Sequence, residues 1–189
     1  MIDPTNITNY NLTVPELEEH ILWWVCAAGK NGVVAAKCLD KLLKNLRAFR
    51  DKRYSPFDLV KYCDVKDLER KMYSVGIGCY TIKSKTFKDL AESKLDLKTC
   101  SVDDLEKIKG IGPKTARCFI IHSRPNQQLA GLDRHILSWL SDLGYKVPKS
   151  TPTGSKYKKI EQWFLAEVKK SGKTVSELDL EIWNNYRIK

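Results

Sequence analysis

The sequence lacks the cysteine pattern of a metal site. No two of its six cysteines are separated by the two residues of a C-x-x-C pair, and none lies in the last third of the chain. They are Cys26, Cys38, Cys63, Cys79, Cys100 and Cys118. Each stands among apolar or mixed helical residues, which is typical of free, buried thiols. The cysteines therefore indicate a reducing compartment and give no metal site.

Long apolar runs are also missing. No span of about 18 apolar residues is present that could cross a membrane. The segment after Met1 does not have the charged, apolar and small-residue regions of a signal peptide. We therefore expect an intracellular protein, in the cytoplasm and nucleoid or in a nucleus, without membrane contact.

Strand patterns are absent too. No useful length of chain alternates apolar and polar residues, and we find no internal repeat. Apolar residues instead recur at helical spacing between capping residues and glycines. We expect an all-α fold of about ten helices in two lobes, preceded by a loosely ordered polar arm over residues 1–12.

Acidic residues are outnumbered by basic ones. The chain of 189 residues has 33 lysines and arginines against 23 aspartates and glutamates, which gives a formal charge of +10. A hydrophobic content of 42% is that of a folded protein. The charge indicates an anionic partner, with nucleic acid as the leading candidate.

The most informative stretch lies between residues 105 and 135. Leu105 and Ile108 have helical spacing, and Gly110-Ile111-Gly112 interrupts it. Two glycines allow a tight hairpin with positive φ angles. Pro113 suits the first turn of a second, buried helix because its missing N–H has no role there.

This helix-hairpin-helix pattern, over residues 102–124, is suited to binding anions. Backbone N–H groups at the hairpin point outward at the positive end of the second helix. Such a site holds a nucleic-acid phosphate without reading sequence. We expect Lys109, Gly110, Ile111 and Gly112 to contact DNA.

Two further residues make the hairpin a candidate active site. Lys114 begins the second helix, and partial desolvation would disfavour its ammonium form and free the amine as a nucleophile. Asp133, 19 positions later, could orient that amine, stabilise positive charge on an opening sugar and shuttle protons. The simpler alternatives are that Lys114 only touches phosphate and that Asp133 only caps the helix that follows it.

These residues carry a resemblance to a known family. Gly-Ile-Gly-Pro-Lys-Thr-Ala at 110–116, followed by Leu-Asp-Arg-His at 132–135, resembles the helix-hairpin-helix DNA glycosylase superfamily, which includes endonuclease III and the 8-oxoguanine glycosylases. The resemblance implies that Lys114 marks a member that also cleaves the strand. It makes Asp133 the essential aspartate and His135 a phosphate contact.

The resemblance also implies an architecture. It gives a single HhH-GPD glycosylase domain over residues 1–189, with an active-site cleft between two lobes. Lobe 1 would contain about residues 1–30 and 145–189. Lobe 2 would contain about residues 31–144, including the helix-hairpin-helix.

The end of the chain indicates which group within this superfamily the sequence resembles. Ser176-Glu-Leu-Asp-Leu-Glu-Ile-Trp183 is similar to the end of the type-2 8-oxoguanine DNA glycosylases. That family implies that Trp183 and Lys189 help recognise the oxidised guanine; a core tryptophan and an incidental terminal lysine are the alternatives. It also implies no iron–sulfur cluster, no cofactor, and a structural monovalent cation at the carbonyls of Gly110 to Gly112.

Two loops in the first half extend the family comparison. By resemblance, Asn31 enters the gap left by an extruded base, with Lys30 beside it, although Asn31 could instead cap the next helix. A second Gly-x-Gly turn at 76–78 opens a lysine-rich helix. There Tyr80 is the candidate wedge residue, and Lys83 is either a DNA contact or an ordinary solvated charge.

We therefore expect a bifunctional base-excision repair enzyme that acts as a monomer on double-stranded DNA containing a damaged base. It would remove 8-oxoguanine through a lysine Schiff base and nick the strand by β-elimination. Two alternatives remain: a glycosylase/lyase for oxidised pyrimidines, like endonuclease III, and a non-enzymatic module whose hairpin only holds phosphates.

Overall fold

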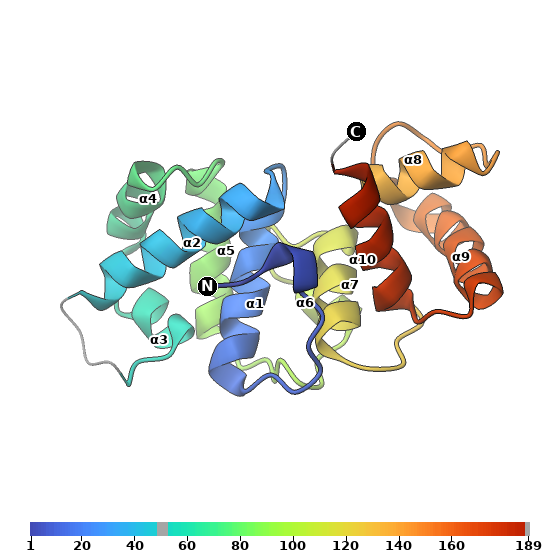
Figure 1. Ribbon diagram of the computed structural model, residues 1–189. Coiled ribbons are helices and arrows are strands. Elements are labelled where there is room, and N and C mark those ends of the chain that lie inside the picture. The colour runs from blue at the N-terminus through green and yellow to red at the C-terminus, as the bar shows by residue number, and fades with distance from the viewer. Residues whose placement is uncertain (49–52, 188–189) are drawn as a thin grey trace. The chain divides into compact units, whose positions relative to one another are not determined.

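The computed structural model describes residues 1–48 and 53–187, which form two compact units (Figure 1). Unit 1 contains Met1–Pro4 and Asn11–Gly112, and unit 2 contains Thr5–Tyr10 and Pro113–Lys189. Over the described residues the chain is helical and has no strand. The all-α fold and its ten α-helices, as predicted, are confirmed.

Unit 1 contains the first six α-helices, preceded by a short 3-10 helix at Pro4–Asn6. These helices are α1 (Val14–Ala27), α2 (Gly32–Arg47), α3 (Pro56–Lys61), α4 (Val65–Ser74), α5 (Tyr80–Glu92) and α6 (Val102–Glu106). Most begin where a capping residue predicts it. Thr13 and Ser101 form capping boxes, and the Asn31 and Asp64 side chains accept two backbone N–H groups each.

The core of unit 1 is arranged around α1, which contacts α2, α3 and α5. Ile21, Leu22, Leu42, Met72 and Phe87 are all fully buried there. Burial of each such side chain contributes about 1.5–3 kcal/mol. Because α1 is apolar on nearly all sides, it is surrounded by its neighbours rather than lying on the surface.

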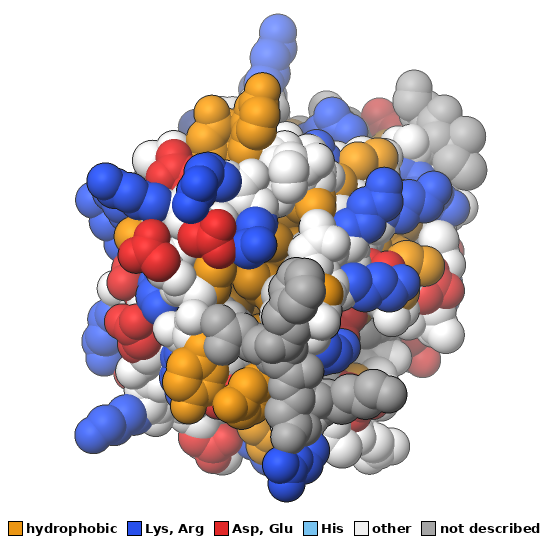
Figure 2. Space-filling model, turned by 90° about the vertical axis from the view of Figure 1, so that its left-hand side faces the viewer, with side chains coloured by type: hydrophobic (Ala, Val, Ile, Leu, Met, Phe, Trp, Pro, Cys, Tyr) orange, Lys and Arg blue, Asp and Glu red, His pale blue; other side chains and the backbone are white. Residues whose placement is uncertain are grey.

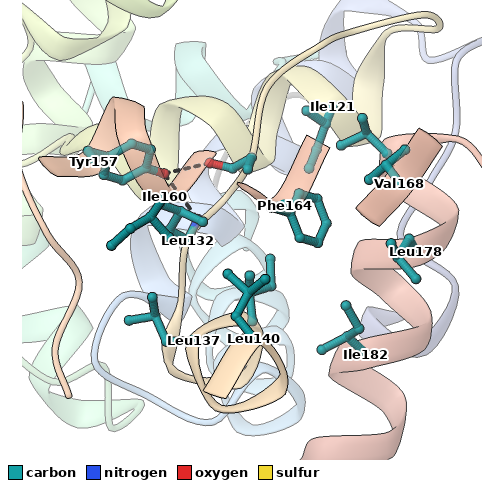
Figure 3. Packing of buried hydrophobic residues seen from close by; sticks show 13 residues of the cluster. Ile121, Leu132, Leu137, Leu140, Tyr157, Ile160, Phe164, Val168, Leu178 and Ile182 are labelled. Atoms are coloured by element: carbon teal, nitrogen blue, oxygen red, sulfur yellow. Dashed lines mark hydrogen bonds between the residues drawn. The ribbon is translucent and has the colours of Figure 1, made fainter. Parts of the chain in front are cut away.

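Unit 2 contains the last four helices, with α10 packed against α7, α8 and α9. They are α7 (Pro113–Ser123), α8 (Arg134–Asp142), α9 (Gly154–Ser171) and α10 (Val175–Tyr186). Figure 3 shows their shared core, in which Leu140, Phe164 and Ile182 come from three different helices.

Unit 2 also includes part of the N-terminal arm. Asn9 N donates to His122 O at 2.9 Å, and the Tyr10 hydroxyl lies 2.6 Å from Ser176 Oγ. The expectation of a loosely ordered arm is therefore wrong for residues 5–10, because polar partners distant in sequence fix them. No helix within the described part of the chain is long and apolar enough to span a membrane.

The two compact units group the helices differently from the predicted lobes. The lobes combined about residues 1–30 with 145–189, whereas unit 1 contains α1 together with α2 to α6. The larger part of unit 2 begins at Pro113, inside the predicted second lobe. The single domain over 1–189 and the active-site cleft between lobes stay predictions.

Candidate functional site

The hairpin between α6 and α7 depends on Gly110. Its φ is +97°, and a Cβ there would lie 2.1 Å from Thr86 Oγ1. The Thr86 hydroxyl donates to Lys109 O at 2.8 Å, which attaches the hairpin to α5. Gly112, in contrast, does not have the expected positive φ, because it precedes Pro113 and such residues favour extended backbone.

The hairpin amides are not all available to an anion. Ile111 N donates to Ile108 O at 3.0 Å, and the Ile111 side chain is buried. The expectation that Ile111 contacts DNA is corrected by this geometry, since both its amide and its side chain serve the hairpin itself. Lys109 is exposed, as a phosphate contact requires.

Lys114 lies in the first turn of α7, where it is half-buried. Cys118 follows one turn later on the same side of the helix, and its thiol is buried. Burial raises the pKa of Cys118 far above its ordinary value, so the thiol is protonated at neutral pH. Lys114 therefore stands beside a neutral sulfur.

Asp133 is the N-cap of α8. Its Oδ1 accepts hydrogen bonds from His135 N at 2.8 Å and Ile136 N at 3.0 Å. The capping role proposed as the simpler alternative is thus present in the structure. It does not exclude a catalytic role, since both cap bonds use Oδ1 and the negative charge of Asp133 acts on Lys114.

The loop that leads to Asp133 is held by α9. Tyr157 OH donates to Ala130 O at 2.6 Å and accepts from Leu132 N at 3.0 Å (Figure 3). Ala130 N donates to Glu161 Oε1 at 2.8 Å, and Glu161 also forms an ion pair with Arg117 at 2.9 Å. These buried contacts fix the backbone immediately before Asp133.

A second carboxylate, Asp179 of α10, lies near Lys114. It is buried, and its Oδ2 lies 3.0 Å from His122 Nε2, whose Nδ1 is 2.7 Å from Thr8 Oγ1. A Cβ on Gly131 would lie 2.2 Å from Cys118 Sγ and 3.7 Å from Asp179 Oδ1. The Cys118 thiol, the Asp179 carboxylate and residues 130–132 therefore lie next to one another.

This environment corrects the expected charge state of Lys114. Burial acts to lower the pKa of the amine, as predicted, but the negative charges around it raise that pKa further than burial lowers it. Those charges are the thiolate form of Cys118, Asp133 and Asp179. The Cys118 thiolate has the largest raising effect, but this form is absent at neutral pH; of the groups that are charged there, Asp133 and then Asp179 favour the ammonium form, and burial opposes them. Lys114 is a protonated lysine in the resting protein.

His135 shares this environment but carries no charge. Burial lowers its pKa below the ordinary value, while Asp133 acts in the opposite direction. The imidazole is therefore neutral at neutral pH. A phosphate contact by His135 would use a neutral N–H donor.

The structure places four further candidates in unit 1. Lys30 Nζ donates to Gly76 O at 2.7 Å, which joins the α1–α2 loop to the turn before α5. Asn31 is exposed, and its side chain caps α2. Tyr80 begins α5, and its ring lies 5.2 Å from that of Tyr73 in an edge-on contact. Both rings are exposed, so the aromatic surface beside the turn is larger than Tyr80 alone.

Lys83 is not a DNA contact, contrary to our expectation. Its side chain is buried, and Nζ donates to Cys26 O and Ala28 O, both at 2.9 Å. These carbonyls lie at the end of α1, where the helix has no N–H partners for them. Burial lowers the pKa of Lys83, and its ammonium serves the fold rather than a ligand.

At the end of the chain, Trp183 is half-buried in α10, and Arg187 Cζ lies 4.9 Å from its ring centroid. This is a cation–π contact. Lys189 lies outside the described residues. Within residues 1–48 and 53–187, no group of three or more His, Cys, Asp and Glu side chains could hold a metal ion.

Comparison with known proteins agrees with this fold. A family model described as "Helix-hairpin-helix motif" matches residues 93–122. The structure of the Methanocaldococcus jannaschii 8-oxoguanine glycosylase/lyase, in complex with DNA containing 8-oxoguanine, is similar with a TM-score of 0.71. It shares 23% sequence identity, over 95% of this chain and 84% of that one.

Two further structures give the same result. The 8-oxoguanine DNA glycosylase of Methanocaldococcus jannaschii has a TM-score of 0.71 and 21% identity, over 97% of this chain and 84% of its own. That of Thermotoga maritima has a TM-score of 0.70 and 19% identity, over 93% and 81%. The chain has the helix-hairpin-helix glycosylase fold. The resemblance carried by residues 105–135 is thus confirmed at the level of the fold.

Within this glycosylase fold, sequence reasoning overlooked Asp179. The signal was present, because Asp179 occupies an inward-facing position of α10 between the buried Val175 and Ile182. An acidic residue at such a position needs a polar partner. Its partner, His122, is 57 residues away and cannot be inferred from local spacing.

Proposed function

We propose that the chain is a DNA glycosylase with lyase activity, and that its substrate is an oxidised guanine, 8-oxoguanine, in double-stranded DNA. The observation that carries the proposal is the electrostatic environment of Lys114, which combines the charges of Asp133 and Asp179 at the start of the second hairpin helix. A lysine that only held phosphate would gain nothing from two nearby carboxylates, since they repel the same anion.

The reaction begins with extrusion of the damaged nucleotide, because C1′ of its sugar is not reachable inside the duplex. Lys114 loses a proton and its amine pair attacks C1′. The bond from C1′ to the base nitrogen breaks, and the base leaves with that electron pair and takes up a proton. Asp133 stabilises the positive charge that develops on the sugar.

Strand cleavage follows from the same lysine. The C1′–O4′ bond breaks as O4′ takes up a proton, and the nitrogen of Lys114 forms a Schiff base with C1′. Removal of a proton from C2′ then expels the 3′ phosphate with its electron pair. This β-elimination leaves a nick 3′ to the lesion and needs no cofactor.

The raised pKa of Lys114 fits this sequence of steps. The resting ammonium form is unreactive, so the lysine attacks only after giving its proton to an acceptor. Asp133 and Asp179 are the carboxylates whose charges act on it. Asp133 is our proposed acceptor, because it lies on the short loop that enters α8 and is held by α9.

The choice of 8-oxoguanine is supported by the names of the structurally similar proteins. We also propose that Trp183 and Lys189 help to recognise the oxidised base. The protein is proposed to act as a monomer inside the cell. A monovalent cation at the hairpin would be held by the carbonyls of Gly110 to Gly112, since those of Ile108 and Lys109 already accept hydrogen bonds.

The test is to trap the Schiff base. The protein is incubated with duplexes that carry 8-oxoguanine, thymine glycol, uracil or an abasic site, and borohydride is added to reduce the imine. The variants are Lys114→Gln and Asp133→Asn; asparagine is also a good N-cap, so the second variant keeps α8.

We expect a covalent adduct with 8-oxoguanine DNA that is lost in Lys114→Gln and strongly reduced in Asp133→Asn. An adduct with thymine glycol alone would support the Schiff-base mechanism and show that the substrate is an oxidised pyrimidine. Tight duplex binding without an adduct on any substrate, including the abasic site, would overturn the lyase and leave a DNA-binding module.

A further inference from the structure

A lysine-rich segment in unit 2 has no part in the chemistry proposed above. Between Asp142 and Glu161 the chain has five lysines and no acidic residue. They are Lys146, Lys149, Lys156, Lys158 and Lys159. All five side chains are exposed, and no ion pair joins any of them to a carboxylate among the described residues.

Several lysines elsewhere are paired with carboxylates, whereas none of these five is paired within the described part of the chain. Lys107 pairs with Asp104, Lys170 with Glu167, and Lys173 with Glu181. On the face drawn in Figure 2, basic and acidic side chains lie among one another. The segment from 146 to 159 therefore concentrates positive charge that no neighbouring carboxylate offsets.

Three contacts hold the two ends of this segment. At one end, the Tyr145 ring stacks on Trp163 with centroids 5.4 Å apart, and Lys159 Nζ lies 5.3 Å from the same Trp163 ring. At the other end, Thr151 Oγ1 donates to Leu132 O at 3.1 Å. The basic segment thus runs from Trp163 to the residue that precedes Asp133.

The first turn of α9 is fixed at the same place. Tyr157 bonds to both Ala130 and Leu132, as Figure 3 shows, so Lys156 and Lys158 are flanking neighbours of a side chain that contacts the loop before Asp133. Tyr157 therefore places the backbone of Lys156 and Lys158 next to the loop before Asp133, within one compact unit. Their position does not depend on how the two units are arranged.

The dimensions and charge fit a stretch of nucleic-acid backbone. From Gly154 to Trp163, α9 rises about 14 Å. Duplex DNA presents a phosphate about every 3.4 Å along each strand, so this length faces about four phosphates of one strand. Mobile lysines without carboxylate partners contact such a row without reading sequence.

We propose that residues 146–159, here called the basic connector, bind the DNA backbone beside the lesion. The proposal rests on the proposed function, since the occupant is the duplex whose damaged base reaches Lys114. The basic connector supplies affinity that is independent of sequence and of the lesion. It holds the strand while the nucleotide is extruded next to Asp133.

The test compares two variants with equal changes in charge. One carries Lys149→Gln, Lys156→Gln and Lys158→Gln in the basic connector. The control carries Lys169→Gln and Lys170→Gln in the last turn of α9 and Lys173→Gln just after it. Glutamine removes the charge and keeps a flexible polar side chain, and all six lysines are exposed. Duplex affinity is measured over a range of salt concentrations, with and without the lesion.

We expect the connector variant to lower the slope of log affinity against log salt by about 1 to 3, because each phosphate contact contributes about 0.9. At about 0.1 M salt its affinity should fall about tenfold or more, equally for damaged and undamaged duplex. The control should keep the slope of the original protein. Equal slopes in the two variants would overturn the proposal.

The Schiff-base assay separates this proposal from the proposed function. With saturating duplex, the connector variant should still form the borohydride adduct, since Lys114 and Asp133 are intact. An adduct together with an unchanged salt slope would overturn the basic connector alone. If the connector variant lowers the salt slope but neither the original protein nor any variant forms an adduct, the proposed lyase activity is wrong and DNA binding by the basic connector is supported. Loss of binding to anionic lipid vesicles, with duplex binding unchanged, would also overturn the proposal.

Discussion

At the scale of single residues, the charge of Lys114 decides when the proposed chemistry can begin. Its attack needs the neutral amine, and a raised pKa leaves less of that form at neutral pH than an ordinary lysine would have. The carboxylates therefore stabilise the resting ammonium and become potential proton acceptors. The neutral His135 nearby adds no positive charge that would oppose this.

The first prediction concerns pH. In single turnovers with abasic DNA, the rate of borohydride trapping should rise with pH across the alkaline range. Asp179→Asn removes a charge that raises the pKa of Lys114, so its profile should shift to lower pH. Glu181→Gln, an equal charge change on an exposed residue of α10, should leave the profile in place. A shift in Glu181→Gln of the same size would contradict the assignment of the effect to Asp179.

The second prediction contrasts the two hairpin glycines. Gly110→Ala should lower the free energy of unfolding by about 2 kcal/mol or more, because alanine is strained at positive φ and its Cβ meets Thr86. Gly112→Ala should change it by less than about 0.5 kcal/mol, since nothing lies within 4 Å of its Cβ position. Denaturant titration of both variants measures the difference. Similar losses in the two variants would contradict this account of the hairpin.

At the scale of elements, α9 is the helix that fixes the loop before Asp133. Its Tyr157 hydroxyl satisfies a buried carbonyl and a buried amide of that loop, and Glu161 satisfies a second amide. Such buried groups are costly to leave without partners. A helix distant in sequence from the hairpin thereby positions the proposed catalytic aspartate.

The third prediction tests this role of α9. Tyr157→Phe should destabilise the protein by about 1–3 kcal/mol, because Ala130 O and Leu132 N lose their partner. It should also slow Schiff-base formation under conditions where the variant is fully folded. Tyr145→Phe removes a hydroxyl that bonds to Glu167 away from the loop, and it should leave the trapping rate unchanged. Equal rates for Tyr157→Phe and the original protein would contradict the positioning role.

The elements also show which features can be predicted from the sequence. The caps at Thr13, Asn31, Ser101 and Thr174 depend on residues within three positions, so local pattern was enough. The role of Lys83 depends on carbonyls 55 and 57 residues away. The helical spacing of Lys83 with the buried Phe87 and Leu90 is a local signal of burial, but nothing local indicates which carbonyls bind it.

The same limit applies to the candidate site. Spacing identified Lys114 and Asp133, because the hairpin and the following cap are local motifs. The sign of the Lys114 pKa shift was wrong in our prediction because the charges of Cys118, Asp133 and Asp179 together outweigh burial, and the last of these residues lies 65 positions further along the chain. Similarly, the arm at residues 5–10 becomes ordered through His122 and Ser176, which no local pattern reveals.

At the scale of the whole molecule, the six cysteines are free, and five of them are buried. Burial raises the pKa of the Cys26 thiol to about 12 and that of Cys118 further still. Since the thiolate is the reactive form, buried thiols with raised pKa values are inert while the protein is folded. Cys79, at the start of α5, is exposed.

The fourth prediction follows from this distribution. A thiol reagent such as dithionitrobenzoate should modify one cysteine rapidly in the folded protein and all six after denaturation. Cys79→Ser should abolish the rapid reaction and leave five thiols in the denatured state. Rapid modification of several thiols in the folded protein would show that the cores of the two units open readily.

The exposure of Cys79 also has a practical consequence. It stands directly before Tyr80, in the turn whose carbonyl at Gly76 binds Lys30. A fluorescent maleimide on this thiol would place a reporter beside an exposed pair of tyrosines without any engineered cysteine. The chain can thus be labelled at a single position, and the predicted contact between DNA and the turn before Tyr80 can be tested in real time.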